Sequence, residues 1–154
     1  MPERVSLGDR LGNTSGTVER PLFHPQSVQR KTILIIDDDG LSSWALSLRL
    51  GKLGFNVIWA QDGAGGLEEA KVRAPDLIIL DLYLPKLSGE EVCKALREGD
   101  DEKLSAIPII MLSAKDKEAD RILGRVIGAN AYISKPYDFN DLLRQMQLLN
   151  LYPG

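Results

Sequence analysis

Four short apolar runs in this 154-residue chain each end on a side chain that could take part in phosphoryl chemistry. Asp37 and Asp38 follow the first run, Asp81 the second, Ser113 the third and Lys135 the fourth. Three carboxylates, a hydroxyl and an ammonium group in one place would suit a divalent cation together with a phosphoryl group. That chemistry requires a fold that gathers the five side chains.

The apolar runs predict such a fold. Short, unbroken apolar runs are typical of strands buried on both faces in a parallel sheet, and ligands bind such sheets beyond the carboxyl ends of the strands. From residue 32 onward the pattern alternates strand and helix five times. This predicts an α/β, doubly wound, five-stranded parallel sheet of flavodoxin-like order 2-1-3-4-5, with helices on both faces. The strands are expected near residues 32–36, 56–59, 76–80, 107–112 and 131–133.

Between these strands, apolar stripes at helical spacing predict amphipathic helices whose stripes face the core. A further helix near residues 63–72 begins with several glycines, each costing about 1 kcal/mol relative to Ala, so its first turn could fray. The stripes are Leu41, Trp44, Ala45 and Leu48; Ala119, Ile122, Leu123 and Val126; and Phe139, Leu142, Leu143 and Met146.

The acidic triplet after the first run indicates a metal site. Asp37, Asp38 and Asp39 would repel one another unless a cation lay between them, and Mg²⁺ favours a few carboxylates with waters and a phosphate oxygen. The alternative is a helix N-cap before the helix that starts near Leu41. Capping could account for Asp39, but hardly for three acids.

Asp81 ends the most apolar run, and the loop after it contains Pro85 and Gly89, which stop any continuation of the strand. Its carboxylate should therefore lie at the sheet edge, where it could attack a phosphoryl group and form an aspartyl phosphate. The same loop could supply a backbone carbonyl, that of Tyr83, to the metal ion.

Lys135 and Ser113 would complete the site. Phosphoryl transfer is catalysed mainly by positioning and by neutralising the phosphoryl oxygens, for which Lys135 supplies a cation and Ser113 a hydroxyl donor. Pro136 fixes the turn after Lys135 and is a candidate for a cis peptide bond that would direct the ammonium group into the site.

Residues 32 to about 150 resemble the receiver domain of two-component response regulators. The motifs are IleIleAspAspAsp, LeuIleIleLeuAspLeuTyrLeuPro, MetLeuSerAlaLys and GlyAlaAsnAlaTyrIleSerLysPro, in the family's order and approximate spacing. The resemblance implies that Asp81 is the phosphoacceptor and that Asp37 and Asp38 are the acidic pair for Mg²⁺. It also implies that Lys135 binds the phosphate, and that Ser113 and Tyr132 are the switch residues.

Two departures from the family pattern bear on function. Asn130 and Ala131 stand where many DNA-binding regulators of this family carry paired acids before the tyrosine, which weakens the case for their ion-paired dimer. By the same resemblance, Tyr83 looks like one of the variable positions that tune phosphoryl lifetime in this family. We expect its bulky ring to shield the aspartyl phosphate from water.

Composition favours one acidic domain with a short extension. Residues 1–31 carry net charge +2 and no sustained periodicity, so they are predicted to be a flexible extension before a receiver domain at 32–154. The whole chain has a net charge of −3, so the residues after 31 carry a net charge of −5. No basic surface indicates direct binding to nucleic acid. No apolar stretch reaches the length of a membrane span, and the single cysteine, Cys93, excludes an internal disulfide, so a cytoplasmic protein is expected.

The function that follows is a phosphorylation-driven switch. A sensor histidine kinase or phosphotransfer protein would be the donor and a downstream protein the target, with no catalysis beyond the domain's own phosphorylation and slow autodephosphorylation. A monomer or a weak phosphorylation-dependent dimer is expected, acting as a stand-alone regulator or a phosphorelay carrier. The alternatives are a receiver excised from a larger regulator, a phosphate-independent binding module, and a hydrolase that also forms an aspartyl phosphate. Tyr83 counts against the hydrolase, because such enzymes usually carry a general acid at that position.

Overall fold

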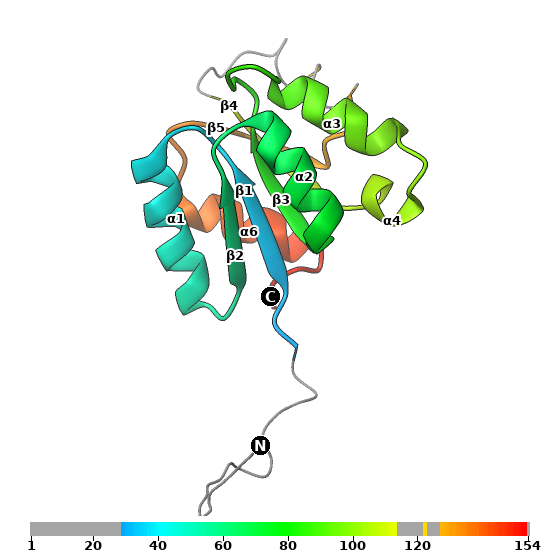
Figure 1. Ribbon diagram of the computed structural model, residues 1–154. Coiled ribbons are helices and arrows are strands. Elements are labelled where there is room, and N and C mark those ends of the chain that lie inside the picture. The colour runs from blue at the N-terminus through cyan, green and yellow to red at the C-terminus, as the bar shows by residue number, and fades with distance from the viewer. Residues whose placement is uncertain (1–28, 114–121, 123–126, 154) are drawn as a thin grey trace, which may run out of the picture.

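The computed structural model describes residues 29–113, 122 and 127–153, and its centre is a five-stranded parallel sheet (Figure 1). The sheet order is β2-β1-β3-β4-β5, which confirms the predicted topology. The third and fourth strands begin later than predicted and end one residue later, so they include Asp81 and Ser113, which still pair with the neighbouring strand. The strands are β1 (Thr32–Ile36), β2 (Asn56–Ala60), β3 (Leu77–Asp81), β4 (Ile109–Ser113) and β5 (Ala131–Ser134).

Helices cover both faces of the sheet. Helices α1 (Gly40–Lys52) and α6 (Phe139–Leu148) lie on one face, and α2 (Gly63–Arg73) and α3 (Gly89–Glu98) lie on the other (Figure 1). The single-turn helix α4 (Glu102–Ser105) is not predicted by any apolar stripe. It forms because the Asp101 carboxylate accepts from the first backbone amides of the turn.

The strands divide the core into two layers because successive side chains of a strand point to opposite faces. In β1, Ile33 and Ile35 face α1 and α6, whereas Leu34 and Ile36 face α2 and α3. All four are at most 1% exposed. Burial on both faces explains why these strands appear in the sequence as continuous apolar runs rather than alternating patterns.

The predicted core stripe of α1 is wrong. Leu41, Trp44 and Leu48 are 76%, 59% and 47% exposed, and Ala45 is exposed as well. The buried positions of this helix are instead Ser43, Leu46 and Leu50. Apolar residues lie on more than one side of α1, so spacing alone allows several inward faces, and the contacts with β1 decide between them.

The other two stripes have different outcomes. On α6, Leu142 and Met146 are fully buried and Phe139 and Leu143 pack partly against the same cluster, as predicted. Ile122 is 55% exposed, contrary to the prediction. Its predicted stripe partners, Ala119, Leu123 and Val126, lie outside the described residues.

The glycines of α2 permit close packing. The helix begins at Gly63, and Asp62 caps it by accepting from the amide of Gly65 at 2.7 Å. A Cβ on Gly66 would lie 2.5 Å from the Ile36 side chain. Glycine is therefore needed where α2 crosses β1, and the packing offsets its low helix propensity.

Within the described ranges, no helix is long and apolar enough to cross a membrane. Residues 1–28 lie outside the described residues, so the division into an extension at 1–31 and a domain at 32–154 stays a prediction.

Candidate functional site

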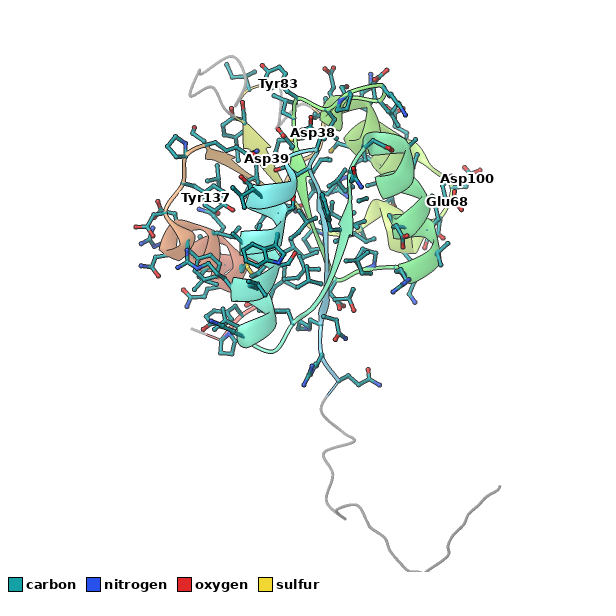
Figure 2. All side chains as sticks on the ribbon, turned by 60° about the vertical axis from the view of Figure 1, so that its left-hand side comes forward. Asp38, Asp39, Glu68, Tyr83, Asp100 and Tyr137 are labelled. Carbon is teal, nitrogen blue, oxygen red and sulfur yellow. The ribbon has the colours of Figure 1, made fainter. Side chains whose placement is uncertain are left out.

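The carboxyl ends of four strands meet at one edge of the sheet and carry the predicted site residues. Asp37 follows β1, Asp81 ends β3, Ser113 ends β4 and Lys135 follows β5. The register fixes this gathering, since the Lys135 amide donates to the Ser113 carbonyl at 2.6 Å. Figure 2 labels Asp38, Asp39 and Tyr83 at the same edge of the molecule.

Lys135 lies between two buried carboxylates. Its Nζ is 3.0 Å from Asp37 Oδ2 and 3.3 Å from Asp81 Oδ2. Asp37 and Asp81 are only 3% and 7% exposed, so each depends on the shared ammonium group to offset the loss of hydration. These three side chains form the centre of the site.

The acidic cluster fits a divalent cation. Asp37, Asp38 and Asp81 each offer a carboxylate oxygen, and the three oxygens lie within 4.8 Å of one another. Hard oxygen donors suit Mg²⁺, which retains several waters in proteins, and exposed Asp38 leaves the cluster open to solvent.

Asp39 does not belong to this cluster and caps α1 instead. Its carboxylate accepts from the Ser42 amide at 3.1 Å and from the Ser42 hydroxyl at 3.0 Å. These hydrogen bonds hold the pKa of Asp39 below its usual value. The capping alternative is therefore correct for the third acid of the triplet, while the first two remain with Asp81.

The environment shifts two pKa values at the centre of the site. Burial raises the pKa of Asp81 to about 6; the Lys135 charge opposes this rise and the Asp37 charge adds to it. Burial would lower the pKa of Lys135, but the hydrogen bond that its ammonium group donates to Asp37 and the charges of the two nearby carboxylates hold it above its usual value. Lys135 therefore stays charged, and a further cation would favour the ionised form of Asp81.

The remaining predicted residues border this centre. Ser113 is fully buried, and Tyr132 is half-buried and packs against the core layer that faces α2 and α3. Tyr83 is 49% exposed, and its backbone N–H donates to Asp81 Oδ1 at 3.2 Å. The peptide bond between Lys135 and Pro136 is cis. The metal-ligand role of the Tyr83 carbonyl and the switch roles of Ser113 and Tyr132 stay predictions.

The site continues into a cleft of about 540 Å³ between α1 and the segment that follows β5. Asp37, Lys135 and Tyr137 line the cleft, together with Ser43 and Arg49 from α1. Small residues of α1 make room for this cleft beside the paired charges. The sequence did not predict this cleft, because the predicted apolar stripe of α1 was expected to pack against the core.

Sequence reasoning also missed two backbone contacts at the site. The Trp59 indole N–H donates to the Asp37 carbonyl at 2.8 Å, whereas the sequence predicts Trp59 only as the last residue of a strand. Gly89 begins α3 directly against Asp81, so that a Cβ there would collide with the Asp81 carbonyl oxygen. Neither contact has a local sequence signal, because each joins residues distant along the chain.

Comparison with known proteins identifies the family. Residues 33–147 match the family model of the response regulator receiver domain. The chain therefore belongs to this family of two-component signalling domains, in which aspartate phosphorylation and Mg²⁺ binding are general features.

Several characterised relatives are longer than this chain. One is the alkaline phosphatase synthesis transcriptional regulatory protein PhoP of Bacillus subtilis, 47% identical over 107 residues that cover 70% of this chain and 43% of the relative. Another is the DNA-binding dual master transcriptional regulator RpaA of Synechocystis, 43% identical over 117 residues that cover 76% of this chain and 48% of the relative. The chain thus spans about half the length of these regulators.

Solved structures of similar fold match this chain over nearly their whole length. The chemotaxis protein CheY4 of Vibrio cholerae superposes with a TM-score of 0.72 at 28% identity, covering 78% of this chain and 98% of that one. The receiver domain of the Francisella response regulator 1452 gives a TM-score of 0.71 at 27% identity, covering 78% of this chain and 96% of that one.

Proposed function

We propose that Asp81 accepts a phosphoryl group from a phosphohistidine of a sensor histidine kinase or phosphotransfer protein, in a Mg²⁺-dependent reaction. The observation that carries this proposal is the position of Lys135 Nζ, within 3.0 Å of Asp37 and 3.3 Å of Asp81 at the carboxyl edge of the sheet. This arrangement leaves Asp38 free to join both carboxylates around a cation.

The reaction is an in-line displacement at phosphorus. An oxygen of ionised Asp81 forms the new P–O bond while the P–N bond to the donor's imidazole breaks, and the leaving imidazole takes up a proton. A magnesium ion held by Asp37, Asp38, Asp81 and the Tyr83 carbonyl would neutralise phosphoryl oxygens. Lys135, already charged beside Asp81, needs only a short movement to contact the transferred group, and Ser113 can donate its hydroxyl to it.

The phosphorylated state would differ by charge and by side-chain position. A phosphoryl group adds about −1.5 to −2 charges next to Ser113 and Lys135. Repositioning of Ser113 and Tyr132 then changes the surface formed by β5 and α6. This is a two-state element that one local charge biases.

The output of the switch would be a protein contact. The described surface is part of an acidic chain of net charge −3, which does not favour direct binding to nucleic acid. The longer relatives are transcriptional regulators, so the receiver can serve as one part of a larger regulator or as a single domain in a phosphorelay. In either setting its chemistry is its own phosphorylation and slow autodephosphorylation.

Intact mass spectrometry after incubation with acetyl phosphate and Mg²⁺ tests this proposal. We expect one added phosphoryl group on the wild type, none on Asp81→Asn and none after chelation. The Lys135→Met variant should accept the group far more slowly while remaining folded. An adduct that persists in Asp81→Asn would contradict the assignment of the acceptor.

A further inference from the structure

Trp59 connects the edge strand β2 to the acidic segment of the site. Its indole N–H donates to the backbone carbonyl of Asp37 at 2.8 Å. The backbone N–H of the same Asp37 donates to the carbonyl of Ala60 at 3.1 Å. Both backbone polar groups of Asp37 are therefore bonded to β2, one through the strand and one through a side chain.

The indole extends the reach of β2 beyond its last strand pair. In the register of the sheet Trp59 lies beside Ile35, and pairing between β1 and β2 ends at Ile36 with Ala60. The Asp37 carbonyl lies past this point, so the Trp59 side chain takes the place of a missing strand partner. A buried or half-buried carbonyl without a partner would cost free energy.

The same ring also lies near the start of α1. A Cβ built on Gly40 would lie 3.5 Å from Trp59 Cη2, in ordinary van der Waals contact, so the indole borders the first residue of the helix. Trp59 therefore bonds to the acidic segment at Asp37 and lies beside its far end at Gly40. The side chain remains 39% exposed, so core burial does not account for its position.

We propose that Trp59 is a positioning residue that holds Asp37 and Asp38 in the arrangement that binds a divalent cation. Two of the three candidate carboxylates come from the segment it fixes, and the third, Asp81, is held independently by β3. The inference rests on the proposed function in one respect, namely that this cluster takes Mg²⁺.

The physical reason is preorganisation. Without the indole donor the Asp37 carbonyl would turn to water, and the segment from Asp37 to Gly40 would sample more conformations. Partners that orient metal ligands from outside typically contribute about 10- to 100-fold to metal affinity. Because Trp59 acts on the backbone of Asp37 and not on its carboxylate, we expect the lower end, about 10-fold.

A matched pair of substitutions tests this role. Trp59→Phe keeps an aromatic side chain but removes the N–H donor, and Trp44→Phe makes the same change at a 59% exposed position on α1. Mg²⁺ affinity is measured by isothermal titration calorimetry and stability by urea unfolding in EDTA. We expect the dissociation constant to rise about 10-fold in Trp59→Phe and to be unchanged in Trp44→Phe.

A purely structural role would give a different result. In that case Trp59→Phe would be less stable in EDTA but would bind Mg²⁺ as the wild type does, and the proposal would be overturned. The wild type provides a second measurement that does not depend on any variant folding. The Trp59 indole N–H should exchange with solvent more slowly than that of Trp44 and should shift in the NMR spectrum when Mg²⁺ is added; equal exchange rates with no shift would also overturn it.

The outcomes separate this inference from the proposed function. A chain that binds Mg²⁺ in a Trp59-dependent manner yet takes no phosphoryl group at Asp81 would refute phosphorylation and leave the role of Trp59 standing. A chain that is phosphorylated at Asp81 with no dependence of Mg²⁺ affinity on Trp59 would refute only the positioning role.

Discussion

At the scale of single residues, the site depends on one ammonium group shared by two buried carboxylates. Lys135 offsets the charges of Asp37 and Asp81, yet burial still raises the pKa of Asp81 to about 6. In the absence of a divalent cation, the ionised Asp81 carboxylate is therefore held in an unfavourable environment. A cation that joins the cluster would relieve this cost and favour the ionised form, which is the form that the proposed phosphorylation requires.

This balance predicts a pH-dependent stability. The metal-free folded state binds the Asp81 proton more tightly than the unfolded chain, whose pKa is near 3.8. The resulting stabilisation is fully present below about pH 4 and is lost as the pH rises through about 6. Asp81→Asn cannot ionise, so in EDTA it should exceed the wild type in unfolding free energy by about 1 kcal/mol at neutral pH, after allowance for solvent screening.

Urea unfolding of both proteins in EDTA near pH 4 and near pH 7.5 measures this difference. The gap should be present at the higher pH and close to zero at the lower pH. A gap of the same size at both values would show that ionisation of Asp81 is not its cause.

Tyr83 should control the lifetime of the phosphorylated state. Its side chain is half-exposed beside Asp81, with its backbone N–H bonded to that carboxylate, so the ring can limit the approach of water to the acyl phosphate. Tyr83→Ala should lose the phosphoryl group several-fold faster, and Tyr83→Phe, which keeps the ring, should behave as the wild type. Loss of the phosphoryl group is followed by intact mass over time, and an unchanged rate in the alanine variant would refute the shielding role.

At the scale of elements, sequence patterns predicted the strands well and the inward face of one helix poorly. The strands are buried on both faces, so their apolar runs show where each strand lies and which polar residue stands at its carboxyl end. Helix α1 carries apolar residues on several sides, and its orientation is determined by contacts with β1 and by the Asp39 cap, which no local period encodes.

The same limit applies to the site. Asp37, Asp38, Asp81 and Lys135 could be predicted because each lies at or just after a recognisable strand end. The contacts of Trp59 and Gly89 could not, because they depend on the distance between β2, α3 and the site in three dimensions. The structural role of Asn130 is similar: its side-chain oxygen accepts from Ile109 N–H at 2.8 Å and from Arg97 at 2.9 Å.

The observed orientation of α1 predicts unequal effects of one substitution at two positions. Leu46 is 6% exposed and Leu48 is 47% exposed on the same helix. Leu46→Ala should lower the unfolding free energy by about 2–5 kcal/mol, because it removes buried methyl groups and leaves a cavity. Leu48→Ala should change it by about 0.5 kcal/mol or less.

Chemical denaturation of the two variants measures these values. A larger loss at Leu48 than at Leu46 would mean that α1 buries the stripe that its spacing first suggested.

At the scale of the whole molecule, metal binding should appear as global stabilisation. A ligand that binds only the folded state stabilises it by RT ln(1 + [L]/Kd), which is about 1.4 kcal/mol at ten times the dissociation constant. For a domain of this size that corresponds to a rise in Tm of about 4 °C. Mg²⁺ should produce this rise in the wild type and not in Asp38→Asn.

A matched control uses an exposed aspartate far from the site. Asp100 lies at the right-hand edge of the molecule in Figure 2, to one side of Asp38, between α3 and α4. Asp100→Asn should retain the full response to Mg²⁺ in differential scanning calorimetry. A lost response in this control would indicate diffuse charge screening instead of a defined cation site.

The proposed function requires Asp81 to form an acyl phosphate. Borohydride reduction of the phosphorylated protein converts an aspartyl phosphate to homoserine, and tandem mass spectrometry then locates the modified residue. After treatment with acetyl phosphate and Mg²⁺, homoserine should appear at position 81 and at no other aspartate. Homoserine at Asp37 or Asp38, or at no position despite a measured phosphoryl adduct, would contradict phosphorylation at Asp81.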